Sequence, residues 1–279
     1  WYTFAAAAGA FAIIPLSGVI ARTGWHNVFL LYALALPILL SAATVLNPSA
    51  RELSRPESDT IAAPSAFSRA WLGIPFALVA VGLVSGAVEN TTHIFLPFRL
   101  TELGETSPSR IAHAVLPIAI GGAASAFCYG YVRQKLSIAS TFLVAFLWGG
   151  ISLLWLGQAA SYEMIIVAGI SLGLAVGLLA PNANAFAAAQ AGPAGPARSI
   201  GFARGAFFAG APVAQLLLEP IASSGGASAA IIALGIFSLL IAVWPLTRLR
   251  MSGRTGVLAS VASLTPGRTR SRHSELGGL

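Results

Sequence analysis

Eight long apolar runs take up most of this chain, and they decide what it can fold into. Each run is close to the roughly 20 residues that a helix needs to cross the hydrocarbon core of a bilayer, and far longer than a membrane strand of about 10 residues. Only 9% of the residues are charged, whereas soluble domains carry about 25%. The sequence therefore predicts an all-α integral membrane protein with eight transmembrane helices. The runs are residues 1–21, 28–46, 71–98, 111–132, 138–158, 164–189, 199–221 and 227–246.

Two polar segments divide the runs into groups. Residues 47–70 carry six charged side chains and three prolines and are too hydrophilic to span, so they predict a linker between residues 1–46 and residues 71–250. Residues 251–279 form a basic tail that we expect to be disordered. Thirteen of the Lys and Arg residues fall on the side of the linker and tail and three on the other. The positive-inside rule then places linker and tail in the cytoplasm, as in a multi-pass protein of a bacterial-like inner membrane.

The third run contains an acidic residue at bilayer depth, Glu89. Such a group costs at least ~2.5 kcal/mol on insertion scales, so it needs a partner, a proton or a water-filled cavity. His93 lies one turn away on the same helical face, and Asn90 flanks that face. Our interpretation is a proton-coupling site at Glu89, with His93 sharing or tuning the proton. The alternatives are a glutamate that fixes helix packing or contacts substrate directly, and a histidine that is merely a satisfied polar residue.

The sixth run carries a ridge of small residues. Gly169, Gly173 and Gly177 recur every fourth residue and share one face. Small residues in this pattern let a neighbouring membrane helix approach closely. We therefore expect this ridge to be a structural contact between helices.

Three stretches resemble the major facilitator superfamily. Residues 9–18 look like the family's fifth helix with its antiporter motif, although Ile14 and Ser17 replace two expected glycines, and residues 24–32 look like the start of the sixth helix. Residues 169–184 are similar to the tenth helix, with repeated glycines and a late proline. Residues 195–201, followed by Ala211 and Pro212, look like the beginning of the eleventh helix and its Gly-Pro.

The resemblance implies helices five to twelve of a twelve-helix carrier, so the chain would be a fragment lacking the first four. Such carriers hold substrate near the midplane between two halves. The runs at 71–98 and 164–189 would line that cavity and bring Asn90, Asn182 and Asn184 to it. Because Asn182 and Asn184 are two residues apart, they cannot both face it squarely, and interhelical packing is the alternative role. Arg204 is expected at the cytoplasmic gate or among lipid headgroups.

The remaining motifs exclude several classes of function. The sequence has no Cys-x-x-Cys or His-x-x-x-His pattern and no glycine-rich phosphate loop, so we expect no metal, no cofactor and no enzyme activity. The basic residues lie between the apolar runs instead of forming a patch, which argues against nucleic acid. We expect a monomeric, proton-coupled transporter of a small organic solute in the lipid bilayer, with efflux favoured by the partial antiporter motif. The rival hypothesis is a non-transporting membrane sensor or scaffold that works through its linker and tail.

Overall fold

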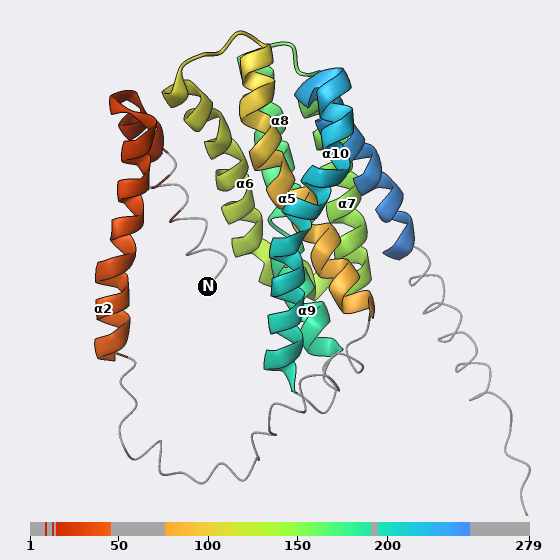
Figure 1. The fold of residues 1–279 in the computed structure, drawn as a ribbon. Helices are drawn as coiled ribbons and strands as arrows, with labels where there is room; N and C mark the ends of the chain where they lie inside the picture. Colours follow the sequence, from red (N-terminus) through yellow and green to blue (C-terminus); the bar gives the residue numbers. More distant parts are fainter. Residues whose placement is uncertain (1–8, 10–12, 14, 46–75, 191–194, 246–279) are drawn as a thin grey trace, which may run out of the picture.

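The computed structural model describes residues 9, 13, 15–45, 76–190 and 195–245. The predicted linker at 47–70, the basic tail at 251–279 and most of the first apolar run lie outside the described residues. All regular structure within the described part is helical (Figure 1). The elements are η1 (Ala21–Thr23), η2 (Trp25–Leu34), α2 (Ala35–Val45), α5 (Phe76–Glu102), α6 (Pro108–Lys135), α7 (Ile138–Gln158), α8 (Tyr162–Val176), α9 (Leu179–Ala189) and α10 (Pro196–Ile241).

Five helices of the described part are long and apolar enough to cross a membrane, so the chain is a multi-pass membrane protein. A shorter apolar helix, His26–Ser41, covers most of the second predicted run. The full set of eight transmembrane helices therefore stays a prediction. The five spans are Phe76–Glu102, Pro108–Lys135, Ile138–Gln158, Tyr162–Ala189 and Pro196–Pro245.

The last span is too long to cross a bilayer once. Its 50 residues would extend roughly 75 Å at 1.5 Å per residue, more than twice the ~30 Å hydrocarbon core. Gly226, with φ of 77°, interrupts the helix. We call residues 196–225 the first arm of α10 and residues 227–241 the second arm. The arms match the seventh and eighth predicted runs.

The two arms of α10 run in opposite directions, as Figure 1 shows. The second arm is antiparallel to α7. The Ser228 hydroxyl donates to the Gly157 carbonyl at 2.7 Å, and further along the Ser238 hydroxyl donates to the Phe146 carbonyl at 2.9 Å. The first arm runs parallel to α5, and the chain doubles back beyond it.

The turn between the arms is held by the end of α5. The Glu102 carboxylate accepts a hydrogen bond from the Ala227 backbone N–H, at the start of the second arm. Such a carboxylate satisfies a backbone donor that the helix itself leaves unpaired. Arg99 pairs with Glu102 at 3.1 Å and donates to the Ala159 carbonyl at 2.7 Å. These contacts join α5, α7 and α10 at what we call the Glu102 end of the bundle.

Serine residues begin three of the helices. Ser107, Ser137 and Ser161 precede α6, α7 and α8, and each side chain accepts a hydrogen bond from the backbone N–H three residues on. Serine is a preferred N-cap because its oxygen satisfies an unpaired donor of the first turn. These caps set where each helix starts after a short connection.

Glycine contacts draw α8 onto α6, as the sequence predicted. A methyl group added at Gly173 would overlap the Ile118 carbonyl, and one at Gly177 would overlap Ser125 and Gly122. Gly121 of α6 meets the α8 backbone in the same way. The predicted glycine ridge is therefore confirmed as a close helix contact.

A second glycine contact joins α5 to the first arm of α10. A methyl group added at Gly86 would overlap the Phe207 backbone, and one at Gly210 would overlap Leu83 and Ala87. The two backbones thus touch about one turn before Glu89 along α5. This contact fixes which residues of α10 can lie near the middle of α5.

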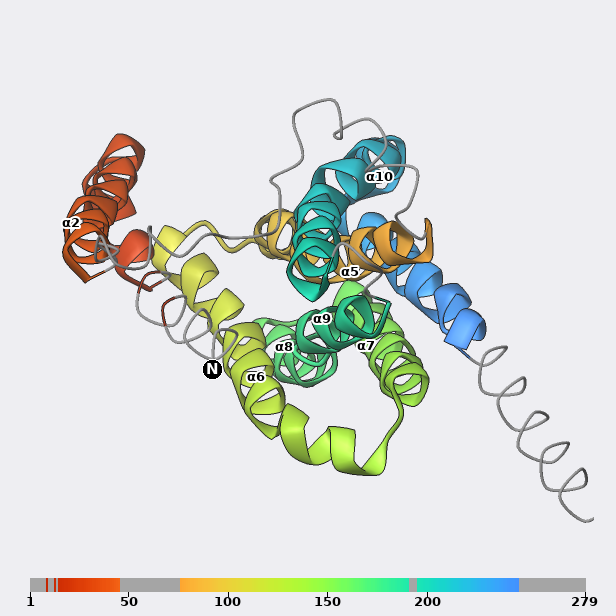
Figure 2. The ribbon, with the colours of Figure 1, turned by 90° about the horizontal axis from the view of Figure 1, so that it is seen from below.

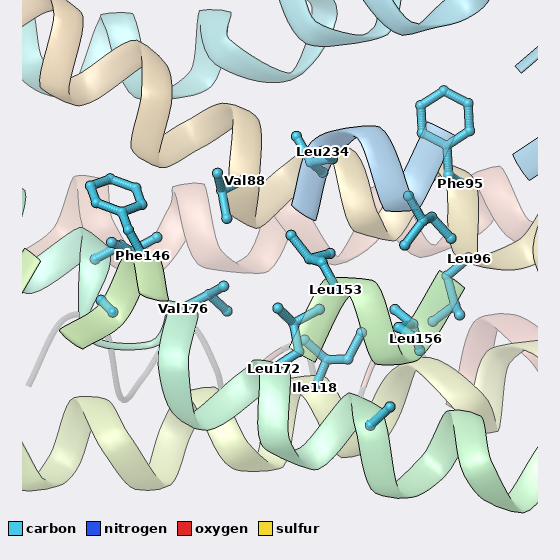
Figure 3. Close-up of a cluster of buried hydrophobic side chains, with 14 of the residues drawn as sticks. Val88, Phe95, Leu96, Ile118, Phe146, Leu153, Leu156, Leu172, Val176 and Leu234 are labelled. Atoms are coloured by element: carbon cyan, nitrogen blue, oxygen red, sulfur yellow. The ribbon is translucent and has the colours of Figure 1, made fainter. Parts of the chain in front are cut away.

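A core of buried apolar side chains fills the space between the helices. It takes Val88 and Phe95 from α5 and Leu234 from the second arm of α10. Figure 3 shows these side chains converging with those of α6, α7 and α8. The labelled members from those three helices are Ile118, Phe146, Leu153, Leu156, Leu172 and Val176.

The N-terminal segment, by which we mean the described residues up to Val45, lies to one side of this bundle. Gly18 packs closely on Ala112 and Ser109 of α6, whereas α2 stands apart from the other helices in Figures 1 and 2. Leu36 and Leu40 are 63% and 67% exposed. Among the described residues, those around Gly18 therefore pack against the bundle, whereas α2 is largely exposed.

Candidate functional site

A cavity of about 780 Å³ opens beside the middle of α5. Its walls come from the N-terminal segment, α5, α6, the junction of α8 and α9, and the first arm of α10. Small-molecule sites in proteins have volumes of roughly 300–1,000 Å³ and mostly apolar walls. We call this space the Glu89 cavity, because that carboxylate lies in its wall.

Glu89 is at the centre of its helix. It is the fourteenth of the 27 residues of α5, so roughly 20 Å of helix extends on either side at 1.5 Å per residue. Its Oε2 atom is buried and has no hydrogen-bond partner among the described residues. A buried polar atom of this kind is unfavourable unless water, a ligand or a proton satisfies it.

The two other α5 residues predicted for the site also line the cavity. Asn90 and His93 share this wall with Glu89, while Val88 points into the apolar core. The Asn90 amide donates to the Gly86 carbonyl at 3.1 Å, which leaves its side-chain oxygen for other partners. One face of α5 is therefore polar and the neighbouring face is packed.

The threonines next to these residues behave differently from each other. Thr92 donates to the Val88 carbonyl at 3.2 Å, which is the usual role of such a hydroxyl in a membrane helix. The Thr91 hydroxyl is buried without a hydrogen-bond partner in the described part of the chain. Neither threonine lines the Glu89 cavity.

Arg204, which the sequence analysis places at the cytoplasmic gate or among lipid headgroups, lies in the same cavity wall as Glu89. Its charge acts on Glu89. The guanidinium carbon is 5.6 Å from the centre of the Phe207 ring, within the range of a cation–π contact. The close contact between Gly86 and Phe207 explains this position, because it brings Arg204 alongside α5.

Phe207 and Phe208 also line the cavity, and the sequence interpretation missed them. Their spacing could have revealed them. Arg204, Phe207 and Phe208 are three and four residues apart, so they share one face of a helix. That face carries one cation and two aromatic rings, as many ligand sites do.

Asn182 and Asn184 lie outside the lining of the Glu89 cavity. Asn182 is fully buried, accepts from the Tyr129 hydroxyl at 3.0 Å and donates to the Ile138 carbonyl at 2.9 Å. It thus links α9 to α6 and to the first turn of α7, which is the packing role given above as the alternative. The Asn184 Oδ1 atom is buried and lacks a hydrogen-bond partner within the described residues.

The part of the chain that the structure describes contains no group of three or more His, Cys, Asp and Glu side chains placed to hold a metal ion. No model of a known protein family matches the sequence, and no curated protein matches it either. A function for this chain is therefore inferred from the geometry of the Glu89 cavity.

Proposed function

We propose that this chain belongs to a secondary active transporter that moves a small organic solute by alternating access, with Glu89 carrying the coupling proton. One observation supports this most directly. The Glu89 carboxylate, whose Oε2 atom has no hydrogen-bond partner among the described residues, lies halfway along a membrane-spanning helix and in the wall of a cavity of about 780 Å³. Transporters bind substrate and coupling ion near the midplane in this way.

Alternating hydration gives the carboxylate its role. When the cavity opens to water, the charged form of Glu89 is solvated and can exchange a proton. When the cavity closes, the charged form loses its hydration, and retention of the proton is favoured. Proton binding is thereby linked to the change in access. His93, one turn along the same wall, is placed to share or relay the proton.

We further propose the major facilitator architecture, with this chain as helices five to twelve of twelve. The three resembling stretches support it. So does the course of the chain from α5 onward, in which five apolar helices are long enough to span and the last of them bends at Gly226 into two arms. The charge asymmetry supports a cytoplasmic linker and tail in an inner membrane. The protein would then need no enzymatic cofactor, since an ion gradient would drive it.

The test is proton movement in proteoliposomes that hold the full-length protein and a pH-sensitive dye. A panel of organic acids, amines, sugars and neutral aromatic compounds is added outside, and the internal pH is followed. At least one class should move protons with the wild type and not with Glu89→Gln. Glu163→Gln is the matched control, because Glu163 is exposed in the first turn of α8. Equal proton movement in Glu89→Gln and the wild type would remove Glu89 from the mechanism.

A further inference from the structure

We propose that Ser85 and Asn184 hold water molecules that carry the coupling proton between Glu89 and the end of the bundle at which α5 begins. This inference rests on the proposed function and adds two residues to its proton site. We call the line of groups from Glu89 through Ser85 to Asn184 the proton route. The end to which it leads, where α5 begins and α9 ends, is called the Phe76 end (Figure 1).

Ser85 has a hydroxyl group that the protein does not use. The residue is fully buried, and its Oγ atom has no hydrogen-bond partner among the described residues. Such a hydroxyl in a membrane helix usually donates to the carbonyl four residues back, as Thr92 of the same helix does. A buried hydroxyl without this bond is unfavourable unless a bound water satisfies it. We therefore expect a water molecule at Ser85.

This water would lie next to the proton site. Ser85 comes four residues before Glu89, so the two side chains share a face of α5 and are about 6 Å apart along the helix axis. One water molecule that bonds to both groups spans roughly 5–6 Å. The Thr91 hydroxyl also lacks a partner within the described residues, but it is only two residues beyond Glu89 and so faces away from it.

The helices α5, α9 and α10 meet beyond Ser85 in a small apolar cluster, which we call the apolar plug and which consists of Leu78, Ala187 and Ala203. Ser85 is seven residues after Leu78 and therefore lies on the face of α5 that forms the plug. Asn184 is three residues before Ala187 and lies on the corresponding face of α9. Both polar residues thus point to the region where α5 and α9 meet.

The order of these groups follows from the directions of the two helices. Arg99, near the end of α5, donates to the Ala159 carbonyl, just before α8 begins. The span that contains α8 and α9 therefore runs opposite to α5. Asn184 then lies roughly one turn, or about 6 Å, beyond Ser85 in the direction of the plug. Its Oδ1 atom is buried and has no hydrogen-bond partner in the part of the chain that the structure describes, so it is placed to accept from a second water.

The Glu89 cavity extends in the opposite direction. Along α5 its lining continues from Glu89 to Pro97, and along α6 it reaches Pro108, the first residue of that helix. The cavity thus leads from Glu89 toward the Glu102 end of the bundle. A solute and a proton can both reach Glu89 from that side.

No comparable space for a solute exists between α5 and α10 on the other side of Glu89, as far as the described residues show. A methyl group added at Gly86 would overlap the Phe207 backbone, and one added at Gly82 would overlap the Ala203 carbonyl. Water molecules held one by one need far less room than a solute. The proton route therefore begins where the cavity stops.

The apolar plug explains how such a route avoids a leak. Its three side chains are buried, and they lie between Asn184 and the Phe76 end. In the described arrangement, Glu89 exchanges its proton through the cavity while the plug keeps bulk water from the route. When the cavity closes and the helices separate at the plug, the Glu89 carboxyl gives its proton to the first water. Successive transfers then deliver the proton to bulk water at the Phe76 end, and Glu89 remains as a carboxylate.

The first test needs no solute, because the probe is the proton itself. Proteoliposomes with the full-length protein and a pH-sensitive dye inside receive an acid pulse outside. Leu78→Ala removes the largest side chain of the plug, so proton entry should rise at least about tenfold, since an apolar barrier to charge is removed. Combining it with Ser85→Ala or with Glu89→Gln should return proton entry to the wild-type level. Leu153→Ala is the matched control, because this leucine is equally buried in the core, away from the route.

The second test looks for the water molecules. Infrared difference spectra between low and high pH are recorded in ordinary water and in H₂¹⁸O, and bands that shift with the isotope belong to water. The wild type should show such bands, and Ser85→Ala and Asn184→Ala should each lose part of them. Ser85→Thr keeps a hydroxyl and should keep the bands. Ser238→Ala is the control, because the Ser238 hydroxyl already donates to the Phe146 carbonyl. Ser85→Ala removes no bond to the described protein, so this variant is expected to fold.

Several outcomes overturn the inference. Proton entry that does not rise in folded Leu78→Ala, or that stays high when Ser85→Ala is added, would show that protons do not follow this route. Entry that stays high with Glu89→Gln would separate the route from the coupling carboxylate. Water bands that are absent from the wild type, or unchanged in Ser85→Ala and Asn184→Ala, would remove water from these residues. Failure of every solute to move protons would instead count against the proposed function.

Discussion

The second arm of α10 and the cavity face of α5 both carry polar groups inside the membrane bundle, but they use them differently. Ser228 and Ser238 each donate to a backbone carbonyl of α7, at 2.7 and 2.9 Å. Glu89 has a buried oxygen without a hydrogen-bond partner in the described part of the chain, and a cavity beside it. The satisfied serines hold helices together, whereas the Glu89 oxygen is left for the ligand or proton of the proposed function.

Helix packing does not account for this difference, because glycines bring the backbones together in both places. Gly150 and Gly235 join α7 to the second arm of α10, and Gly86 and Gly210 join α5 to the first arm. The two interfaces diverge only one turn beyond the Gly86 contact, where α5 presents Glu89. Substitutions that change transport and stability separately would show which of the two interfaces is functional.

The largest effect is expected at Glu89. Glu89→Gln should lower substrate-driven proton flux by at least about 100-fold, the lower range for loss of a positioned proton-transfer group. It should not lower the free energy of unfolding, because a neutral amide is easier to bury than a carboxylate. Flux in proteoliposomes and unfolding in mixed micelles measure the two quantities. A variant that kept its flux and lost stability would make Glu89 a structural residue.

The next effect is expected at the contact of α5 with α10. Gly210→Ala should lower the free energy of unfolding by about 2 kcal/mol, because the added methyl overlaps the α5 backbone and forces the helices apart. Gly205→Ala, on the same helix with open space around it, is the matched control. Equal stability of the two variants, measured in mixed micelles, would mean that this contact is not as tight as described.

A smaller effect is expected at Asn182. Asn182→Ala removes both hydrogen bonds of the side chain and takes away the acceptor of the Tyr129 hydroxyl, so unfolding should become easier by about 1–2 kcal/mol. The affinity for substrate should stay within about twofold, since the residue lies outside the Glu89 cavity. A large change in affinity with little change in stability would return Asn182 to the predicted substrate site.

The smallest effect is expected at Ser238. Ser238→Ala removes one hydrogen bond between the second arm of α10 and α7, and such bonds average about 0.6 kcal/mol in membrane bundles. Transport should be unchanged at saturating substrate. Loss of transport in a variant of normal stability would show that a satisfied polar group can also be functional, and would weaken the comparison.

Local pattern was enough to predict part of the fold and of the site. The apolar runs predicted the positions of α5 to α10. The recurrence of Gly169, Gly173 and Gly177 at every fourth residue predicted the close helix contact that α8 makes with α6. The spacing of Glu89 and His93 placed both on one wall. These features follow from the period of a single helix, because the spacing of residues along the sequence decides which of them share a helical face.

The position of Arg204 could not be predicted in the same way. It depends on which residues of α10 touch α5, and therefore on the pairing of Gly86 with Phe207 across a long sequence separation. Asn182 is similar, because its face is decided by Tyr129 on α6 and Ile138 at the start of α7. Which residues of two distant helices touch each other cannot be read from the spacing of residues in one sequence.

Infrared difference spectra of the full-length protein in lipid, recorded between low and high pH, would show directly whether Glu89 carries a proton. If Glu89 is the carboxyl group that carries the coupling proton, the wild type should show a protonated carboxyl band at low pH that disappears at high pH. That band should be missing from Glu89→Gln and present in Glu163→Gln. A band that persists in Glu89→Gln would assign the proton to another carboxyl group and remove Glu89 from the proposed mechanism.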